Sequence, residues 1–163
     1  MAERMAPPAA AAWLAAALCL ASGAVEAAGC TPGVLELRDA DSVLRFEVEV
    51  ADTEPERAQG LMNRESLPRF GGMLFVYPEA GPVAFWMRNT LIPLDMLFFD
   101  EAGRLARVHE NAKPLDETPI IGGDAIRYVL EINGGMTKTL GIDEGAELQS
   151  PAIDQATAAW PCG

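Results

Sequence analysis

The sequence predicts a mostly β fold: a compact single-domain β-barrel or sandwich with one or two short helices, preceded by a signal peptide. Many short apolar segments follow one another at close spacing, with turn-forming glycine and proline residues between them. Only one segment has clear helix-start signals, and neither an internal repeat nor a long linker divides the chain. The 163 residues therefore suit one domain that buries a sizeable core.

An alanine-rich run near the N-terminus predicts export. Residues 9–21 are apolar, Arg4 precedes them, and Val25-Glu26-Ala27 places small residues at a cleavage position. Because this run is too short to cross a bilayer, we expect a signal peptide at residues 1–27, a β-rich domain at 28–150 and a C-terminal tail at 151–163 pinned to the body. The protein would be periplasmic or secreted, without a membrane span after processing. An N-terminal anchor that stays attached is the alternative.

The cysteines point to the same compartment. Cys19 lies in the apolar run and would be removed with it, which leaves Cys30 and Cys162 near the two ends of the mature chain. An even pair in an oxidising compartment predicts one disulfide. Such a bond closes a long loop and is worth ~4–5 kcal/mol in the chain-entropy model. Ala27-Ala28-Gly29-Cys30 also resembles a weak lipobox, so lipidation of Cys30 is the alternative, and it would leave Cys162 unpaired.

The first half of the domain begins with strands and the one clear helix. Residues 34–37 are a short apolar segment, and residues 44–50 alternate strictly between apolar and polar, which predicts a half-buried strand. Thr53 and Glu56 form a capping box, and Pro55 suits the first helical turn. A short helix is therefore expected to start here and to end near residues 60–62.

The remaining apolar runs, bounded by turn residues, predict the rest of the sheet. Strands are expected at residues 73–77, 83–87, 95–99, 105–110, 128–132 and 145–149. Residues 134–140 predict one short helix or turn. Pro114, Pro119 and Gly122-Gly123 predict a long irregular loop over residues 111–124.

Alternation within residues 83–88 points to a candidate site. Side chains on a strand alternate between its faces, so Val83, Phe85 and Met87 are expected in the core. The opposite face carries Trp86 and Arg88, which together could stack on a planar or sugar-like ligand. The competing explanation is an arginine whose stem lies over a partly buried tryptophan.

The polar residues after this strand have two explanations. Asn89 and Thr90 readily bond nearby backbone groups in turns, and Asp95 could accept from the same turn, from Arg88 or from Arg57. These residues therefore either latch the fold or face a ligand. Glu131 lies in an otherwise apolar strand, and we expect it on the solvent face or paired with an arginine in an Arg57/Arg88 network.

Several function classes are disfavoured by composition. The formal net charge of −12 makes nucleic acid or anionic lipid a poor partner. His109 is the only histidine, so an ordinary zinc site or a Ser-His-Asp triad is not expected, and His109 is interpreted as a surface residue. Thioethers can bind Cu(I), but the methionines alternate onto core faces and are explained as core filler. We expect no metal and no cofactor.

Four motifs follow one another in the order found in a known family. They are Arg57-Ala58-Gln59-Gly60-Leu61-Met62, Gly72-Met73-Leu74-Phe75, residues 85–95 (FWMRNTLIPLD) and Tyr128-Val129-Leu130-Glu131. Together they resemble the prokaryotic domain of unknown function 192 family, over roughly residues 34–149. The resemblance implies a compact, mostly β, often exported single domain without an established activity. It marks Arg57, Trp86, Arg88, Asn89, Thr90, Asp95 and Glu131 as the polar residues of the family pattern.

Three hypotheses for function follow. The first is a periplasmic binding or accessory module, with a groove built from these polar and aromatic residues for a small polar or anionic ligand, saccharide-like ligands included. The second is a carboxylate-dependent enzyme that uses Asp95 or Glu131 as general base, with Arg57 or Arg88 holding an anion. The third is a structural or interaction protein whose motif only stabilises the fold. The sequence indicates neither the ligand nor the oligomeric state.

Overall fold

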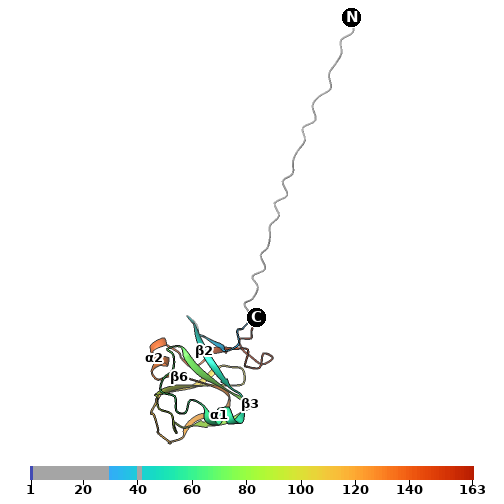
Figure 1. The fold of residues 1–163 in the computed structure, drawn as a ribbon. Coiled ribbons are helices and arrows are strands. Elements are labelled where there is room, and N and C mark those ends of the chain that lie inside the picture. Colours follow the sequence, from blue (N-terminus) through green and yellow to red (C-terminus); the bar gives the residue numbers. More distant parts are fainter. Residues whose placement is uncertain (2–29, 40–41) are drawn as a thin grey trace.

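The computed structural model describes Met1 and residues 30–39 and 42–163, and it confirms a mostly β fold. Seven strands form one curled, half-barrel sheet in the order β5-β4-β6-β3-β2-β1-β7 (Figure 1). The strands are β1 (Val34–Arg38), β2 (Val43–Ala51), β3 (Gly71–Phe85), β4 (Leu94–Phe99), β5 (Leu105–Ala112), β6 (Ile120–Asn133) and β7 (Glu147–Gln149). The helices are α1 (Glu54–Gln59) and α2 (Met136–Leu140). The predicted signal peptide lies outside the described residues, apart from Met1.

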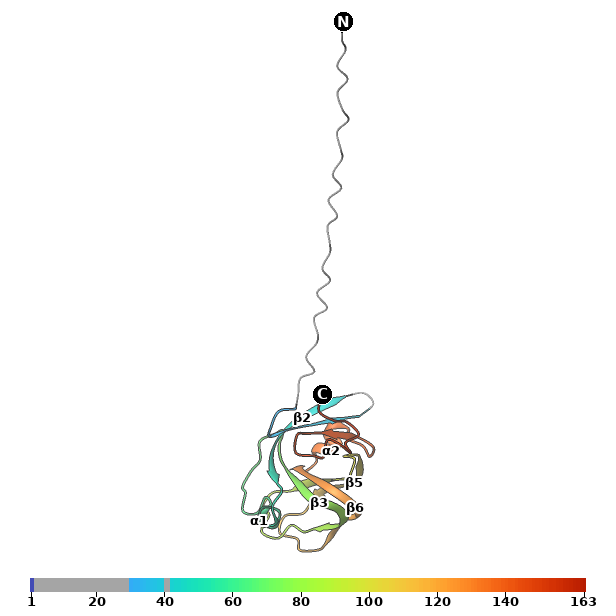
Figure 2. The ribbon, with the colours of Figure 1, turned by 90° about the vertical axis from the view of Figure 1, so that its right-hand side faces the viewer.

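Helix α1 lies in the connection between the two parallel strands, β2 and β3. The predicted capping box is confirmed, because the Thr53 side chain accepts from the Glu56 backbone N–H and the Glu56 carboxylate accepts from the Thr53 N–H. Both views of the molecule place α1 at the end away from the C-terminus (Figures 1 and 2). The other strand pairs are antiparallel.

The two faces of the sheet carry separate apolar clusters. Tyr128, Leu130 and Ile132 of β6 belong to the first cluster, and Val129 belongs to the second, as the alternation of a strand requires. The second cluster also contains Met87, whose burial confirms the predicted division of residues 83–88 between core and outside. Glu131 shares the face of Val129 and therefore lies on the side of the second cluster.

The predicted irregular loop over residues 111–124 is wrong at both ends. β5 continues to Ala112, and β6 already begins at Ile120, so only residues 113–119 connect them. β6 bends back over the second cluster: Phe98 pairs with Val129, yet a Cβ atom at Gly122 would lie 2.3 Å from the Phe98 ring. A straight strand would separate residues 122 and 129 by about 23 Å. The two glycines, which we interpreted as loop formers, instead allow this close approach.

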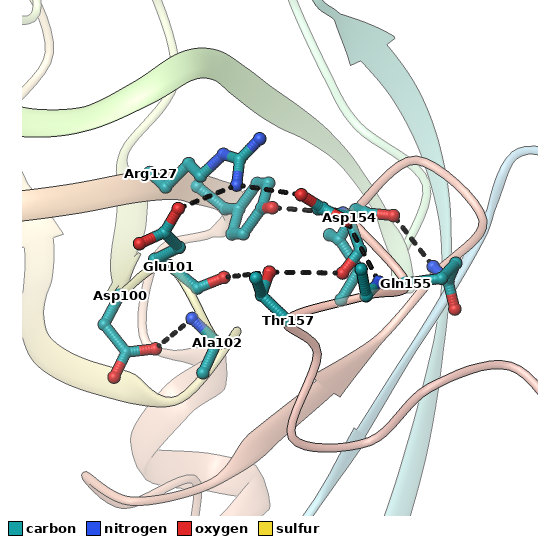
Figure 3. Close-up of polar contacts among 10 residues, drawn as sticks. Asp100, Glu101, Ala102, Arg127, Asp154, Gln155 and Thr157 are labelled. Carbon is teal, nitrogen blue, oxygen red and sulfur yellow. Dashed lines mark hydrogen bonds and ion pairs between the residues drawn. The ribbon is translucent and has the colours of Figure 1, made fainter.

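The C-terminal tail packs against the turn between β4 and β5. The Arg127 guanidinium forms ion pairs with Glu101 (3.1 Å) and with Asp154 of the tail (3.3 Å), as Figure 3 shows. The Thr157 hydroxyl donates to the Glu101 carbonyl, and the Asp154 N–H donates to the Tyr128 hydroxyl. The end of the tail is fixed by a disulfide between Cys30 and Cys162, the predicted pair.

Removal of the disulfide is expected to destabilise the fold by about 4–5 kcal/mol in the chain-entropy model, because it closes a loop with a sequence separation of 132 residues. The double variant Cys30→Ser, Cys162→Ser should show a correspondingly lower urea midpoint by circular dichroism. Wild-type protein treated with dithiothreitol should unfold at the same midpoint as the variant. An unchanged midpoint in both would contradict the prediction.

Candidate functional site

The seven predicted site residues do not gather around one cavity. Thr90, Asp95 and Glu131 are buried, whereas Trp86, Arg88 and Asn89 are exposed. Four surface hollows lined by described residues have volumes between about 260 and 650 Å³, and none of the seven residues lines any of them. The motif therefore has more than one role.

Trp86 and Arg88 form the exposed part of the motif. The Trp86 side chain is 46% exposed, and the Arg88 guanidinium carbon lies 5.4 Å from the centroid of its ring. This contact covers part of the ring, as the competing interpretation expected, but it leaves much of the indole in contact with solvent. Trp86 therefore presents a partly open ring at the surface, next to the charge of Arg88.

Asn89 and Thr90 hold three segments of backbone together. Asn89 has a positive φ of 54°, and its carbonyl accepts from the Asn63 N–H (2.8 Å) in the loop after α1. The Thr90 carbonyl accepts from the Leu115 N–H (3.1 Å), and its hydroxyl donates to the Arg88 carbonyl (3.3 Å). Asparagine tolerates this left-handed backbone conformation better than most residues. These two residues are part of a structural latch.

Asp95 is fully buried and accepts four hydrogen bonds. One carboxylate oxygen accepts from the N–H groups of Asn111 (2.7 Å) and Gly135 (2.8 Å). The other accepts from the N–H (2.8 Å) and the hydroxyl of Thr137. Its partners thus belong to β5 and to the start of α2, rather than to the neighbouring turn, Arg88 or Arg57 as the sequence suggested. Asp95 joins three elements from inside.

Arg57 also stabilises backbone. Its guanidinium donates to the carbonyls of Val76 (2.9 Å) and Asp52, and it lies 5.2 Å from the centroid of the Tyr77 ring. Arg57 therefore joins α1 to the residue that follows β2 and to the middle of β3. It makes no ion pair with any described carboxylate.

Glu131 is the least expected of the seven. It is 4% exposed, its register partners are Met73 in β3 and Met96 in β4, and its carboxyl has no hydrogen bond or ion pair to another described residue. The predicted Arg57/Arg88 network and the solvent-facing alternative are therefore both wrong. Burial raises the pKa of Glu131 from 4.5 to about 8. Burial is also the main cause of the raised pKa of Tyr77, and the nearby Glu131 adds to it.

Neither carboxyl group is arranged as a general base. The oxygens of Asp95 are already occupied by four donors in a fully buried position. Glu131, with a pKa of about 8, is mostly protonated at neutral pH and so cannot accept a proton there. A base also needs to reach a bound substrate, and neither side chain lines any of the four hollows.

A different set of residues does line a cavity. The hollow beside β5, which we call the β5 hollow, has a volume of about 460 Å³. Its polar wall is formed by Arg107, His109, Asn111, Lys113, Asp116 and Thr118. Its apolar wall is formed by Met87, Pro119, Ile120 and Ile121. The volume falls within the range of small-molecule sites in proteins.

A β-bulge at Ala106 sets the direction of the Arg107 and His109 side chains. Leu105 pairs with Phe99, and the next pair is Arg107 with Phe98, so Ala106 is an extra residue in β5. The bulge turns Leu105 toward the first cluster, while Arg107 and His109 share the face of Phe98 and Met96. Strict alternation without the bulge would have put His109 on the face of Leu105. Instead, Arg107 and His109 point to the side on which the β5 hollow lies.

The β5 hollow is basic in an acidic protein. Arg107, His109 and Lys113 are accompanied by a single carboxylate, Asp116, whose pKa is lowered by hydrogen bonds from Thr118. The other three hollows are richer in carboxylates, and the arginines Arg38 and Arg64 that line two of them are ion-paired. By contrast, Arg107 and Lys113 form no ion pair with any described residue. Arg107 lines both the β5 hollow and the third of the other hollows, where the carboxylates are Asp100, Asp124 and Glu144.

Sequence reasoning missed Arg107 and Lys113 as functional candidates. The available signal was the regular spacing of Arg107, His109, Asn111 and Lys113, but nothing in that pattern shows that residues 116–121 close a hollow over it. No cluster of three or more histidine, cysteine, aspartate or glutamate side chains suited to a metal ion occurs among the described residues. Within the same part of the chain, no helix is long and apolar enough to cross a membrane.

Comparison with known proteins identifies relatives without an established activity. No curated protein matches the chain. A crystal structure of a protein of unknown function from Novosphingobium aromaticivorans DSM 12444 is 38% identical with a TM-score of 0.69, over 71% of this chain and 82% of that one. A protein from Sinorhizobium meliloti 1021, suggested to be a transcription regulator, is 37% identical with a TM-score of 0.73, over 77% of this chain and 98% of that one.

The family model described as uncharacterized ACR, domain of unknown function 192 (DUF192), matches residues 35–150, which include β1 to β7 and every residue of the latch and of the β5 hollow. The protein belongs to the DUF192 family.

Proposed function

We propose that this protein is an exported binding module that holds a small anionic ligand in the β5 hollow. The observation that carries the proposal is the convergence of Arg107, His109 and Lys113 on one hollow with a single carboxylate, in a chain of net charge −12. A guanidinium and an ammonium without ion-pair partners are well suited to carboxylate, phosphate or sulfate groups.

Export is supported by two independent features. The apolar run at residues 9–21, followed by small residues at 25–27, has the pattern of a secretory leader. The disulfide between Cys30 and Cys162 belongs to an oxidising compartment. Both features support a location in the periplasm or outside the cell.

The two other hypotheses from the sequence fit the geometry less well as descriptions of the whole protein. A carboxylate-dependent enzyme would need Asp95 or Glu131 in contact with a substrate, and the first is saturated with donors while the second is buried and protonated. A purely structural role describes Asn89, Thr90 and Asp95, but it does not account for the unpaired cations in the hollow. A regulator role is suggested for the S. meliloti protein. We do not propose that role here, because the net negative charge of this chain opposes binding to nucleic acid.

Neutralising the two permanent cations of the β5 hollow is expected to weaken anion binding at least tenfold. The double variant Arg107→Gln, Lys113→Gln removes two charge-assisted hydrogen-bond donors, each worth about 1.5–3 kcal/mol when it contacts an anion. Isothermal titration with inorganic phosphate, sulfate and acetate at low ionic strength and constant pH would measure the effect.

Lys138→Gln is the matched control, because it makes the same chemical change on the exposed side of α2, outside the hollow. It should leave the affinity unchanged. If wild-type protein binds none of the three anions at millimolar concentration, or if the double variant binds them as well as wild type does, the proposal fails.

A further inference from the structure

We infer that the ligand of the β5 hollow is an amphipathic anion, with a charged head between Arg107 and Lys113 and an apolar body that lies against Ile121 and Trp86. This inference rests on the proposed function and adds the chemical class of the ligand. It is carried by the apolar wall of the hollow and by the exposed apolar surface that continues from it.

The hollow itself is half apolar. Met87, Pro119, Ile120 and Ile121 line it opposite the cations, so a purely hydrophilic anion would leave this wall unused. Ile121 is 54% exposed, which is high for a large aliphatic side chain in a β-strand. Covering it would remove apolar surface from water and so favour a ligand with an apolar part.

The apolar wall extends beyond the rim of the hollow. Ile121 pairs with Ala84 across β3 and β6, and Trp86 follows the last residue of β3, two residues after Ala84, with both side chains exposed. Residues at such diagonal positions are within reach of an aromatic side chain. Trp86 therefore extends the apolar surface that begins at Ile121, and its Arg88 neighbour keeps a positive charge at the far side.

The backbone that presents this surface is fixed. The Met87 N–H donates to the Asp116 carbonyl (2.8 Å), and the Leu115 N–H donates to the Thr90 carbonyl (3.1 Å), so the Trp86 segment is tied to the loop that closes the hollow. Leu115 adopts a positive φ of 62°, unfavourable for a leucine, and its side chain is exposed. The latch built by Thr90 thus holds the cationic and the apolar parts of the site in one arrangement.

A series of straight-chain carboxylates tests the inference on the whole protein. Affinity for acetate, butanoate and hexanoate, measured by isothermal titration, should rise by about three- to fourfold per added methylene. This fold-change corresponds to the free energy of burying one methylene group, about 0.8 kcal/mol. The indole N–H resonance of Trp86, identified by its absence in Trp86→Phe, should shift with hexanoate and not with acetate. Hexan-1-ol, which has the same body without the charge, should bind at least tenfold more weakly than hexanoate.

Two substitutions at exposed positions test whether the apolar body of the ligand contacts Ile121 and Trp86. Ile121→Thr and Trp86→Ala should each reduce the affinity for hexanoate by a larger factor than the affinity for acetate. If acetate, butanoate and hexanoate bind with equal affinity, the inference is overturned and the proposed anion site stands. If hexan-1-ol binds as tightly as hexanoate, the assignment of a charged head is overturned. Failure of every anion to bind overturns both proposals.

Discussion

Replacement of Asp95 by asparagine is expected to lower the free energy of unfolding by about 2–4 kcal/mol. The carboxylate is fully buried and accepts from three backbone N–H groups and one hydroxyl. An amide can offer only one oxygen to these donors, and its own NH₂ group would face at least one N–H group. Buried donors that lose their acceptor are costly because no water replaces it.

The position of Asp95 in the fold increases the loss of stability expected for Asp95→Asn. Its partners Asn111, Gly135 and Thr137 belong to β5 and to the entry of α2, and both Asn111 (φ 53°) and Gly135 (φ 80°) have left-handed backbone. The carboxylate therefore stabilises two backbone conformations that are unfavourable or unusual by themselves. Because α2 has no side-chain N-cap of its own, Asp95 from β4 supplies the acceptor for its first turn.

Urea unfolding with the disulfide intact would measure the loss. Asp100→Asn is the matched control: its carboxylate also accepts from two N–H groups, those of Ala102 and Arg104, but in an exposed turn where water can replace it. We expect a loss below about 1 kcal/mol there. Thr137→Val removes only the hydroxyl donor to Asp95 and should fall between the two. Equal losses for Asp95→Asn and Asp100→Asn would show that burial of the carboxylate does not matter.

The features of the fold that the sequence predicted correctly are those that depend on local periodicity. Alternation placed Val83 and Met87 in the core and Trp86 and Arg88 outside, and the capping box located α1 to within a residue or two. Both features are decided by neighbours a few residues apart. A one-residue insertion is enough to break such reasoning: the Ala106 bulge reverses the faces of Arg107 and His109, and a second irregularity between His109 and Ala112 restores the alternation.

The features that the sequence did not predict depend on contacts between segments far apart in the chain. The donors that occupy Asp95 are 16 to 42 residues away in sequence, so a latch and a ligand site looked equally acceptable from residue types alone. Gly122 was interpreted as a loop former because its role, close approach to Phe98, requires β6 to bend back over the sheet. The same bend brings Ile121 opposite Arg107 and Lys113 and so creates a hollow that no local pattern indicates.

Glu131→Gln is expected to stabilise the protein in mildly alkaline solution by roughly 2–5 kcal/mol while leaving its stability near pH 4 almost unchanged. Burial raises the pKa of Glu131 to about 8, above the ordinary 4.5 that it has in the unfolded chain. Below pH 4.5 the carboxyl is protonated in both states and has no pH-dependent effect. As the pH rises from 4.5 to 8, the unfolded chain releases the proton and the folded chain retains it, so stability is progressively lost.

The difference between wild type and variant, followed by urea unfolding at several pH values, isolates this group from the other titrating residues. Glu49→Gln is the control of opposite sign, because the hydrogen bond from Arg64 lowers the pKa of Glu49 and so makes its charged form stabilising. That variant should be slightly less stable than wild type at high pH, by less than ~1 kcal/mol for a largely exposed pair. The side-chain carboxyl carbon of Glu131 should titrate near pH 8 in nuclear magnetic resonance.

A flat difference between pH 4 and pH 8 would mean that Glu131 is not held in its neutral form, and that the second apolar cluster is open to water at this point. A difference that grows as the pH rises, which is the expected result, would mean that Glu131 is held in its neutral form in the folded protein. Glu131 lies between Met73 and Met96, and Met96 in turn pairs with His109 of the β5 hollow. A carboxyl that stays protonated is then a neutral part of the core beneath the hollow. The neutral Glu131 carboxyl therefore adds no negative charge near Arg107 and Lys113. Asp116 is the one acidic residue that lines the β5 hollow.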